Sequence, residues 1–253
     1  VCTLLVDTLN SVGVPFETVD IDEQTLCIDE NELFEKLNKK KDSYEGLLFV
    51  HSYGLLRDCT SFYKEVKTIK NDLLIIDDRS LCIPTLEEPQ KNNADLILYS
   101  TGRGKYIDFT MGGYGWCDER FSAMKNIPIS FDSKRYFDLI LERKPRRENH
   151  AILIKNIYKN GLSIEIQYPE NFQDWRFNIC VQNKDKLMHI LKENGLIANS
   201  EYAPLQHYEG DVNKTKAMKV HSTMINLFHD YRISEPMANK IVEIISMDFV
   251  TNP

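Results

Sequence analysis

The stretch from Leu73 to Gly113 constrains the fold of this chain most. It contains two short apolar runs, Leu73–Ile76 and Leu96–Tyr99, and turn-forming or polar residues bound each of them. Runs of this kind are typical of strands in a parallel sheet that is covered on both faces. Ligands of open α/β sheets bind beyond the carboxyl ends of the strands, so polar residues at those ends are candidates for a binding site.

Around this stretch, predicted helices and strands alternate. Helices are expected over 1–12, 29–39 and 58–70, and strands over 16–21, 46–50 and 112–117. The alternation favours βαβ crossovers, and therefore an α/β fold with a mostly parallel sheet and flanking helices. The link over 81–93 contains two prolines and cannot be a regular crossover helix.

The pattern changes after residue 131. A long charged helix is expected over 133–160, with a break or kink at Pro145. Further helices are expected over 184–193 and 234–246, and strands over 175–181, 196–202 and 221–227. We therefore expect a large α/β domain over 1–131 and a smaller C-terminal α+β domain over 132–253.

Composition excludes several classes of function. The 253 residues carry a formal net charge of −7, which provides no basic surface for nucleic acid or an anionic membrane. No apolar run reaches the roughly 18 residues of a spanning helix, so a cytoplasmic protein is expected. The six cysteines and six histidines show no metal-ligand spacing. We expect reduced thiols packed in the core and no bound metal.

Three polar residues follow the predicted strands. Asp78 ends one strand, Ser100 ends the next, and Lys105 follows in a glycine-rich segment. A pyridoxal phosphate enzyme needs such groups: an amine that condenses with the aldehyde, an acid for the ring nitrogen, and a hydroxyl for the phosphate. Each residue also has an ordinary interpretation, as a turn cap, a turn former or a solvated lysine. A phosphate-binding P-loop is excluded, because tyrosines occupy positions 99 and 106.

The order of these residues resembles one enzyme family. Asp78, then Ser100 and Lys105 as Ser-x-x-x-x-Lys, then Gly112-Gly113, are similar to the pattern of the DegT/StrS-type sugar-nucleotide aminotransferases, which are fold-type I pyridoxal phosphate enzymes. The resemblance extends in both directions along the chain. The similar segments are His51-Ser-Tyr53-Gly54 upstream, and Trp175–Val181, Leu187–Gly195 and Tyr202-Ala-Pro-Leu205 downstream.

The resemblance implies a function and a set of roles. Lys105 would form the Schiff base with pyridoxal 5'-phosphate and relay protons, Asp78 would keep the ring nitrogen protonated, and Ser100 would bind the phosphate. Tyr202 and His207 match the loop that faces the substrate. The implied reaction transfers an amino group, with glutamate as the expected donor, to a nucleotide-linked keto sugar. The family also implies a homodimer.

The sequence departs from the family pattern in two places. Arg79, Ser80 and Leu81 occupy positions where the family has two small residues and then glutamine. The family's first segment, with a glycine turn that holds phosphate, would precede Val1, so we expect a fragment or a shortened relative. Two alternatives follow: a noncatalytic remnant that acts as a binding or assembly module, and a pyridoxal phosphate lyase or dehydratase. His51 is open to two interpretations, a ligand contact or a structural role.

Overall fold

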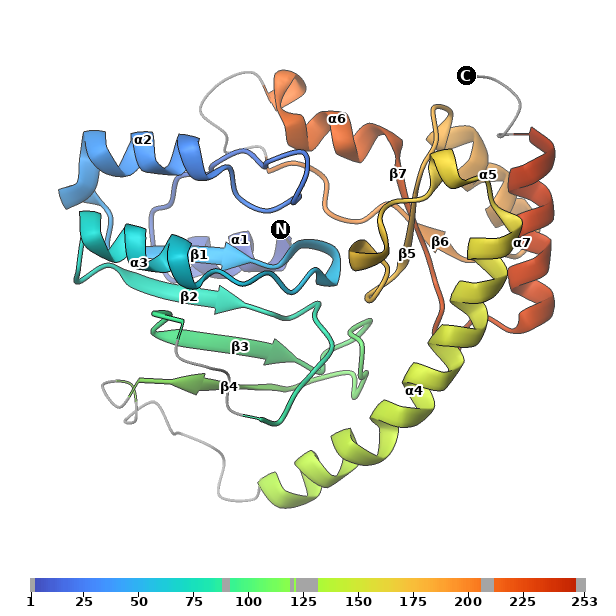
Figure 1. The fold of residues 1–253 in the computed structure, drawn as a ribbon, viewed down its shortest axis with the longest axis horizontal. Coiled ribbons are helices and arrows are strands. Elements are labelled where there is room, and N and C mark those ends of the chain that lie inside the picture. Colours follow the sequence, from blue (N-terminus) through green and yellow to red (C-terminus); the bar gives the residue numbers. More distant parts are fainter. Residues whose placement is uncertain (1–2, 88–91, 119–120, 122–131, 206–211, 249–253) are drawn as a thin grey trace. The chain divides into compact units, whose positions relative to one another are not determined.

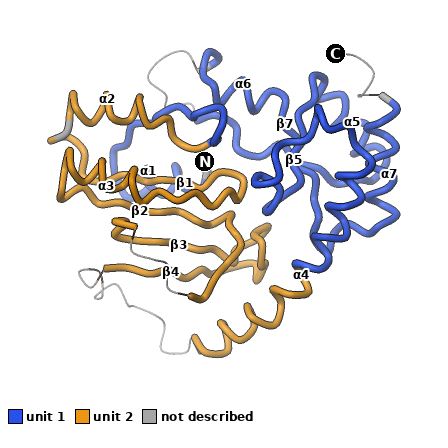
Figure 2. The backbone as a smooth tube through the Cα atoms, viewed as in Figure 1, with its two compact units in different colours: residues 1–26, 148–253 blue, residues 27–147 orange. Residues whose placement is uncertain are grey.

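The computed structural model describes residues 3–87, 92–118, 121, 132–205 and 212–248. The chain divides into two compact units (Figure 2): unit 1 comprises residues 1–26 and 148–253, and unit 2 comprises residues 27–147. Helix α4 (Ser133–Gly161) contributes residues to both units. The division into domains over 1–131 and 132–253 stays a prediction.

Unit 2 contains a four-stranded sheet with strands in sequence order (Figure 1). Its strands are β1 (Gly46–Val50), β2 (Leu74–Asp78), β3 (Leu96–Ser100) and β4 (Gly113–Cys117). Strands β1, β2 and β3 run parallel, and β4 pairs antiparallel with β3. This mostly parallel sheet confirms the predicted fold class for this part of the chain.

Helices α2 (Glu30–Lys40) and α3 (Thr60–Ile69) belong to the same unit. Asp29 caps α2, because its carboxylate accepts the backbone N–H groups of residues 31 and 32. The ring of Phe62 on α3 lies 5.8 Å from Phe34 of α2 and 5.6 Å from Phe49 of β1. These aromatic contacts join both helices to one face of the sheet.

The two faces of this sheet differ in burial. We call the face that carries Phe49, Ile75 and Asp77 the buried face, because these three side chains are fully buried. The opposite side, the open face, carries Asp78, Ser100 and Leu98, and the Leu98 side chain is 38% exposed. Most other residues of the open face are half-buried, so this face is covered less completely than the buried face.

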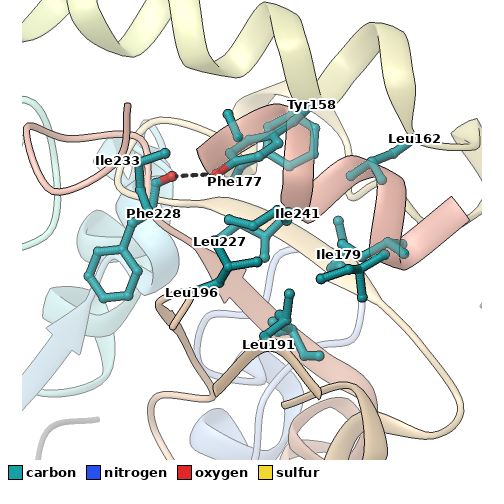
Figure 3. Packing of buried hydrophobic residues seen from close by; sticks show 14 of the residues in the cluster. Tyr158, Leu162, Phe177, Ile179, Leu191, Leu196, Leu227, Phe228, Ile233 and Ile241 are labelled. Carbon is teal, nitrogen blue, oxygen red and sulfur yellow. Dashed lines mark hydrogen bonds between the residues drawn. The ribbon is translucent and has the colours of Figure 1, made fainter. Parts of the chain in front are cut away.

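Unit 1 contains a three-stranded antiparallel sheet in the order β5-β7-β6. Its strands are β5 (Phe177–Cys180), β6 (Ala198–Asn199) and β7 (Met224–Leu227), and its helices, besides α4, are α1 (Thr3–Ser11), α5 (Lys184–Glu193), α6 (Lys216–Thr223) and α7 (Glu235–Asp248). The sheet packs its apolar face on α4, α5 and α7 (Figure 3). Tyr158 of α4 lies in this core, and its hydroxyl donates to the carbonyl of Phe228 at 3.0 Å.

Three expected elements differ in the structure. Residues 16–20 form no strand, because Asp20 binds elsewhere: its carboxylate accepts the backbone N–H groups of Lys216 and Ala217 at the start of α6. The strand expected over 196–202 is reduced to two residues. The strand expected over 221–227 begins at Met224, because α6 continues to Thr223.

Helix α4 continues through Pro145 without a break. Proline lacks the N–H group that would bond to the carbonyl of Leu141 one turn earlier. The Leu141 side chain is exposed, so water can take the place of that lost bond. Solvent therefore allows a proline that a buried helix would not accept.

Cysteines and surface properties add three findings. Cys27, Cys59 and Cys82 are buried free thiols, whereas Cys117 on β4 is exposed, against the expectation of a core position. Among the described residues, no helix is long and apolar enough to cross a membrane. In the same residues, His, Cys, Asp and Glu side chains form no group of three that could hold a metal ion.

Candidate active site

The open face of the sheet brings two predicted residues to the same edge. Asp78 is the last residue of β2 and Ser100 is the last residue of β3. In the parallel register Asp78 lies beside Leu98, and side chains two residues apart on a strand share a face. Asp78 and Ser100 are therefore on one face, at the carboxyl ends of neighbouring strands, and both are half-buried.

Asp78 has an acceptor oxygen to offer a ligand. Its Oδ1 accepts the backbone N–H of Ser80 at 2.8 Å, so the carboxylate does cap a turn. Its backbone carbonyl accepts the N–H of His51 at 3.0 Å, which ties the end of β2 to β1. Within the described parts of the chain, no cation forms an ion pair with Asp78. The structure thus leaves this acid with unused hydrogen-bonding capacity.

Lys105 lies in the loop that follows β3, and it is half-buried. Its backbone N–H donates to the carbonyl of Gly102 at 3.2 Å, which closes a tight turn. The carboxylate of Asp108 accepts two hydrogen bonds within this loop. Its Oδ2 accepts the N–H of Gly104 at 2.8 Å, and its Oδ1 accepts the N–H of Thr110 at 2.7 Å. The backbone around the lysine is therefore fixed by hydrogen bonds of its own loop.

The first half of α4 braces the same loop. The guanidinium group of Arg143 lies 4.6 Å from the ring centre of Phe109, and that of Arg147 lies 4.6 Å from the ring centre of Tyr106. Residues four apart on a helix share a face, so one side of α4 supplies both contacts. Arg143 also donates to the carbonyl of Asp108 at 3.2 Å. Sequence reasoning missed this bracing, since no local pattern connects α4 with the loop.

The loop stores backbone strain at a non-glycine residue. Thr110 has a φ of 68°, a left-handed conformation that is unfavourable for a β-branched side chain. Gly113, at the start of β4, has another constraint, because a Cβ atom there would lie 2.5 Å from the carbonyl oxygen of Tyr99. The glycine at 113 thus serves close packing against β3. Strain of the kind seen at Thr110 is concentrated at functional sites in proteins.

Asp77, the neighbour of Asp78, points to the buried face and has partners for both oxygens. Its Oδ1 lies 2.7 Å from Nε2 of His51, and its Oδ2 accepts hydrogen bonds from Arg79 Nη2 at 2.8 Å and Asn92 Nδ2 at 2.9 Å. Burial by itself would raise the pKa of Asp77, but the hydrogen bonds and charges of His51 and Arg79 lower it to about 2. Both oxygens of Asp77 thus have partners, and its charge has a structural role.

The Asp77 network settles two points that the sequence left open. His51 is fully buried and contacts Asp77, so its structural role is the one that the geometry supports. Arg79 occupies a position where small residues were expected, yet its side chain turns to the buried face and is only 8% exposed. Strand alternation predicts the direction of Asp77. No local signal predicts that the loop would return Asn92 to it.

Of the two candidate substrate residues, Tyr202 belongs to unit 1 and His207 falls outside the described residues. Tyr202 follows β6, has a φ of 64°, and its ring lies 5.5 Å from that of Trp175. Arg176, the neighbour of Trp175, is buried and pairs with Asp230 at 3.4 Å, so it has a structural role. His207 lies outside the described residues. The roles of Tyr202 and His207 stay predictions.

Solved structures share this architecture, whereas no family model and no curated protein matches the sequence. A protein described as a sugar aminotransferase, Spr1654 of Streptococcus pneumoniae in its PMP form, aligns with a TM-score of 0.75 and 15% identity over 95% of this chain and 77% of that one. The protein has the sugar aminotransferase fold.

Two further structures support this fold. A DegT DnrJ EryC1 StrS aminotransferase from Brucella abortus aligns with a TM-score of 0.67 and 14% identity over 95% of this chain and 75% of that one. DesI, solved in the presence of its TDP-sugar product, aligns with a TM-score of 0.75 and 13% identity over 95% of this chain and 71% of that one. The sugar aminotransferase fold thus extends over nearly the whole chain.

Proposed function

We propose that this chain is a pyridoxal phosphate-dependent aminotransferase that transfers an amino group, from glutamate as donor, to a nucleotide-linked keto sugar. The observation that carries the proposal is the arrangement on the open face: an acid and a hydroxyl end neighbouring strands, and a lysine follows in a braced loop. The fold it shares with sugar aminotransferases supports the same assignment.

The chemistry of these side chains fits the cofactor. Asp78 has an acceptor oxygen to spare for a protonated ring nitrogen, whereas Asp77 has none. Ser100 accepts the N–H of Gly102 through Oγ at 3.2 Å, which leaves its own proton for a phosphate oxygen. Lys105 supplies the amine. The set therefore provides one group for each part of the cofactor.

Each residue has a defined task in this proposal. When bound, the cofactor supplies an electron-withdrawing ring that stabilises negative charge at the substrate carbon. Lys105 would supply the amine that condenses with the cofactor aldehyde, with release of water, and would move a proton at the substrate carbon. Asp78 keeps the proton on the ring nitrogen through a charge-assisted hydrogen bond. Ser100 would hold the phosphate through its hydroxyl group.

The substrate class rests on the related structures. Spr1654 was solved in PLP and PMP forms, which are the two states of a cofactor that carries amino groups. DesI was solved with a TDP-sugar product, which supports a nucleotide-linked sugar as the acceptor here. We further propose a homodimer that acts in the cytoplasm. The glutamate donor and the homodimer rest on the family resemblance described above, and the location rests on the sequence alone.

A cofactor titration tests the proposal. The purified chain with added pyridoxal phosphate should develop the yellow colour of an imine, which glutamate should bleach. Borohydride should remove the colour and fix the cofactor covalently to the protein. The Lys105→Ala variant should lose the colour, whereas Lys64→Ala, which removes an exposed lysine of α3, should keep it. Absence of colour in the unmodified chain would contradict the proposal and would favour a noncatalytic module.

One structural finding weakens the noncatalytic alternative. A bulky Arg79 beside the acid would argue against cofactor binding if it projected onto the open face. Its side chain instead pairs with Asp77 on the buried face. A lyase or dehydratase would use the same lysine. Turnover of glutamate with a keto sugar nucleotide would distinguish transfer from elimination.

A further inference from the structure

Two consecutive carboxylates lie on opposite faces of β2, and they differ in every partner. Asp77 on the buried face receives hydrogen bonds from Arg79 and Asn92 and contacts His51. Asp78 on the open face receives one backbone N–H. Like charges on adjacent residues repel, so a second carboxylate beside Asp78 changes its electrostatic environment unless something balances that charge.

Arg79 is placed to balance it. Its Nη2 and Nε lie 2.8 Å and 3.2 Å from Asp77 Oδ2, and its Nη1 lies 3.4 Å from the hydroxyl of Tyr99. Its backbone N–H donates to the carbonyl of Leu98 at 2.8 Å. Arg79 thus joins the end of β2 to β3 through its main chain and to Asp77 through its side chain, directly beside Asp78.

We propose that Arg79 is a positioning residue for Asp78: it holds Asp77 as a permanent ion pair on the buried face, and so keeps the direction and the charge surroundings of Asp78 constant. The inference rests on the proposed function, because Asp78 is the acid assigned to the cofactor ring. In that role, a neighbouring charge that changed with pH would weaken the hold on the ring nitrogen over part of the pH range.

The other groups that face Asp77 cannot replace Arg79. Burial raises the pKa of Cys59, which precedes α3, to about 12, and it also raises the pKa of Tyr63 on α3, of Tyr99 on β3 and of Cys82. These groups are uncharged at neutral pH. His51, at the end of β1, is the remaining titratable partner. Of the described groups around Asp77, Arg79 alone carries a charge at every working pH.

Removing the guanidinium group should therefore add a titration step. In Arg79→Met, the carboxylate of Asp77 loses the guanidinium group that lowers its pKa, so the charge beside Asp78 becomes dependent on pH. We expect the dissociation constant of pyridoxal phosphate in this variant to change about tenfold as the pH passes through the added step. A tenfold change corresponds to a shift of roughly one pKa unit. The carboxyl carbon signal of Asp78 in the unliganded chain should show a second inflection at the same pH.

Two further variants give matched controls. Asp77→Asn with Arg79→Met removes both charges together, so the added step should vanish. Asp77→Asn alone removes a negative neighbour and leaves the guanidinium unbalanced, so the carboxyl carbon signal of Asp78 should change at lower pH than in the unmodified chain. This opposite sign keeps the test decisive if Arg79→Met fails to fold. Arg79→Lys restores the charge and should restore most of the wild-type profile.

The outcomes separate this inference from the proposed function. If Asp78 shows no added inflection in folded Arg79→Met, or if Asp77→Asn leaves its midpoint unchanged, Arg79 has no influence on Asp78 and the inference is overturned. Failure of the unmodified chain to bind pyridoxal phosphate would instead refute the proposed function. The carboxyl titration of the unliganded chain gives its result in either case.

Discussion

The two sheets of this protein contradict the usual relation between strand direction and burial. Parallel sheets are ordinarily covered on both faces, and antiparallel sheets often expose one. Here the antiparallel sheet is enclosed, and all four residues of β7 are buried. The mostly parallel sheet leaves one face open, and β4 alternates exposed and half-buried residues. The open face is the one that carries Asp78 and Ser100.

The polar residues of the two sheets differ in the same way. On the second face of the small sheet, Asn178 and Asn226 are fully buried and bonded to each other at 2.7 Å. Asn226 also accepts the backbone N–H of Glu201 at 2.8 Å. Asp78 and Ser100, in contrast, retain hydrogen-bonding capacity. Satisfied polar groups mark structure here, and partly satisfied ones mark the candidate site.

The largest expected contrast is in apolar side chains. Ile225 on β7 is fully buried, so Ile225→Ala should lower the free energy of unfolding by about 3 kcal/mol through lost burial and a cavity. Leu98→Ala, on the open face of β3, should cost less than about 1 kcal/mol. Urea unfolding followed by circular dichroism measures both. Equal losses would show that the open face is covered.

A smaller contrast concerns the polar residues. Asn226→Ala leaves Oδ1 of Asn178 and the N–H of Glu201 without the hydrogen bonds that Asn226 makes with them, which should cost about 2 to 3 kcal/mol of stability. Ser100→Ala should change stability by less than about 0.5 kcal/mol and instead weaken the binding of pyridoxal phosphate. Denaturation and cofactor titration on the same two variants test this. A stability loss as large in Ser100→Ala would refute the distinction.

The two carboxylates of β2 should separate in their pH dependence. The pKa of Asp77 is lowered to about 2, so its ionised form stabilises the folded chain above the ordinary pKa, and this stabilisation is lost as pH falls towards 2. Asp77→Asn should remove about 2 kcal/mol at neutral pH and flatten the acid-side decline. Asp78→Asn, which removes the neighbouring carboxylate of the same strand, serves as the comparison. Unfolding curves at a series of pH values provide the measurement.

The smallest effect concerns the loop that carries the lysine. Thr110→Gly relieves the left-handed backbone and should raise the melting temperature, by an amount equivalent to about 1 kcal/mol. Thr68→Gly, within α3, should destabilise the protein by about as much, since glycine weakens a helix. A Thr110→Gly variant that is less stable than the unmodified chain would show that the threonine side chain holds the loop.

Local patterns predict much of the fold, for identifiable reasons. The apolar run of β1 and the amphipathic helix α5 lie at the predicted residues, because period and flanking turn residues determine such elements. The segment around Asp20 alternates like a strand, but it binds the start of α6, which lies far along the sequence. A single sequence contains no signal for such a contact.

The candidate site likewise contains residues that local patterns predict and residues that depend on distant segments. Asp78, Ser100 and Lys105 are predicted from local strand ends and spacing together with the family resemblance, and their roles stay predictions. The partners of Asp77 come from three separate segments, and a family pattern with small residues at position 79 gives no hint of an ion pair. The less complete covering of the open face was also unforeseen, since apolar runs reveal the character of a strand and not what packs on it.

The most direct test of the central claim locates the covalent attachment of the cofactor. The chain is incubated with pyridoxal phosphate, reduced with borohydride, digested and mapped by mass spectrometry. The account predicts that the phosphopyridoxyl group is on Lys105, with attachment reduced in Asp78→Asn and retained in Lys64→Ala. Attachment spread over exposed lysines, or a Lys105 that stays unmodified, would contradict it.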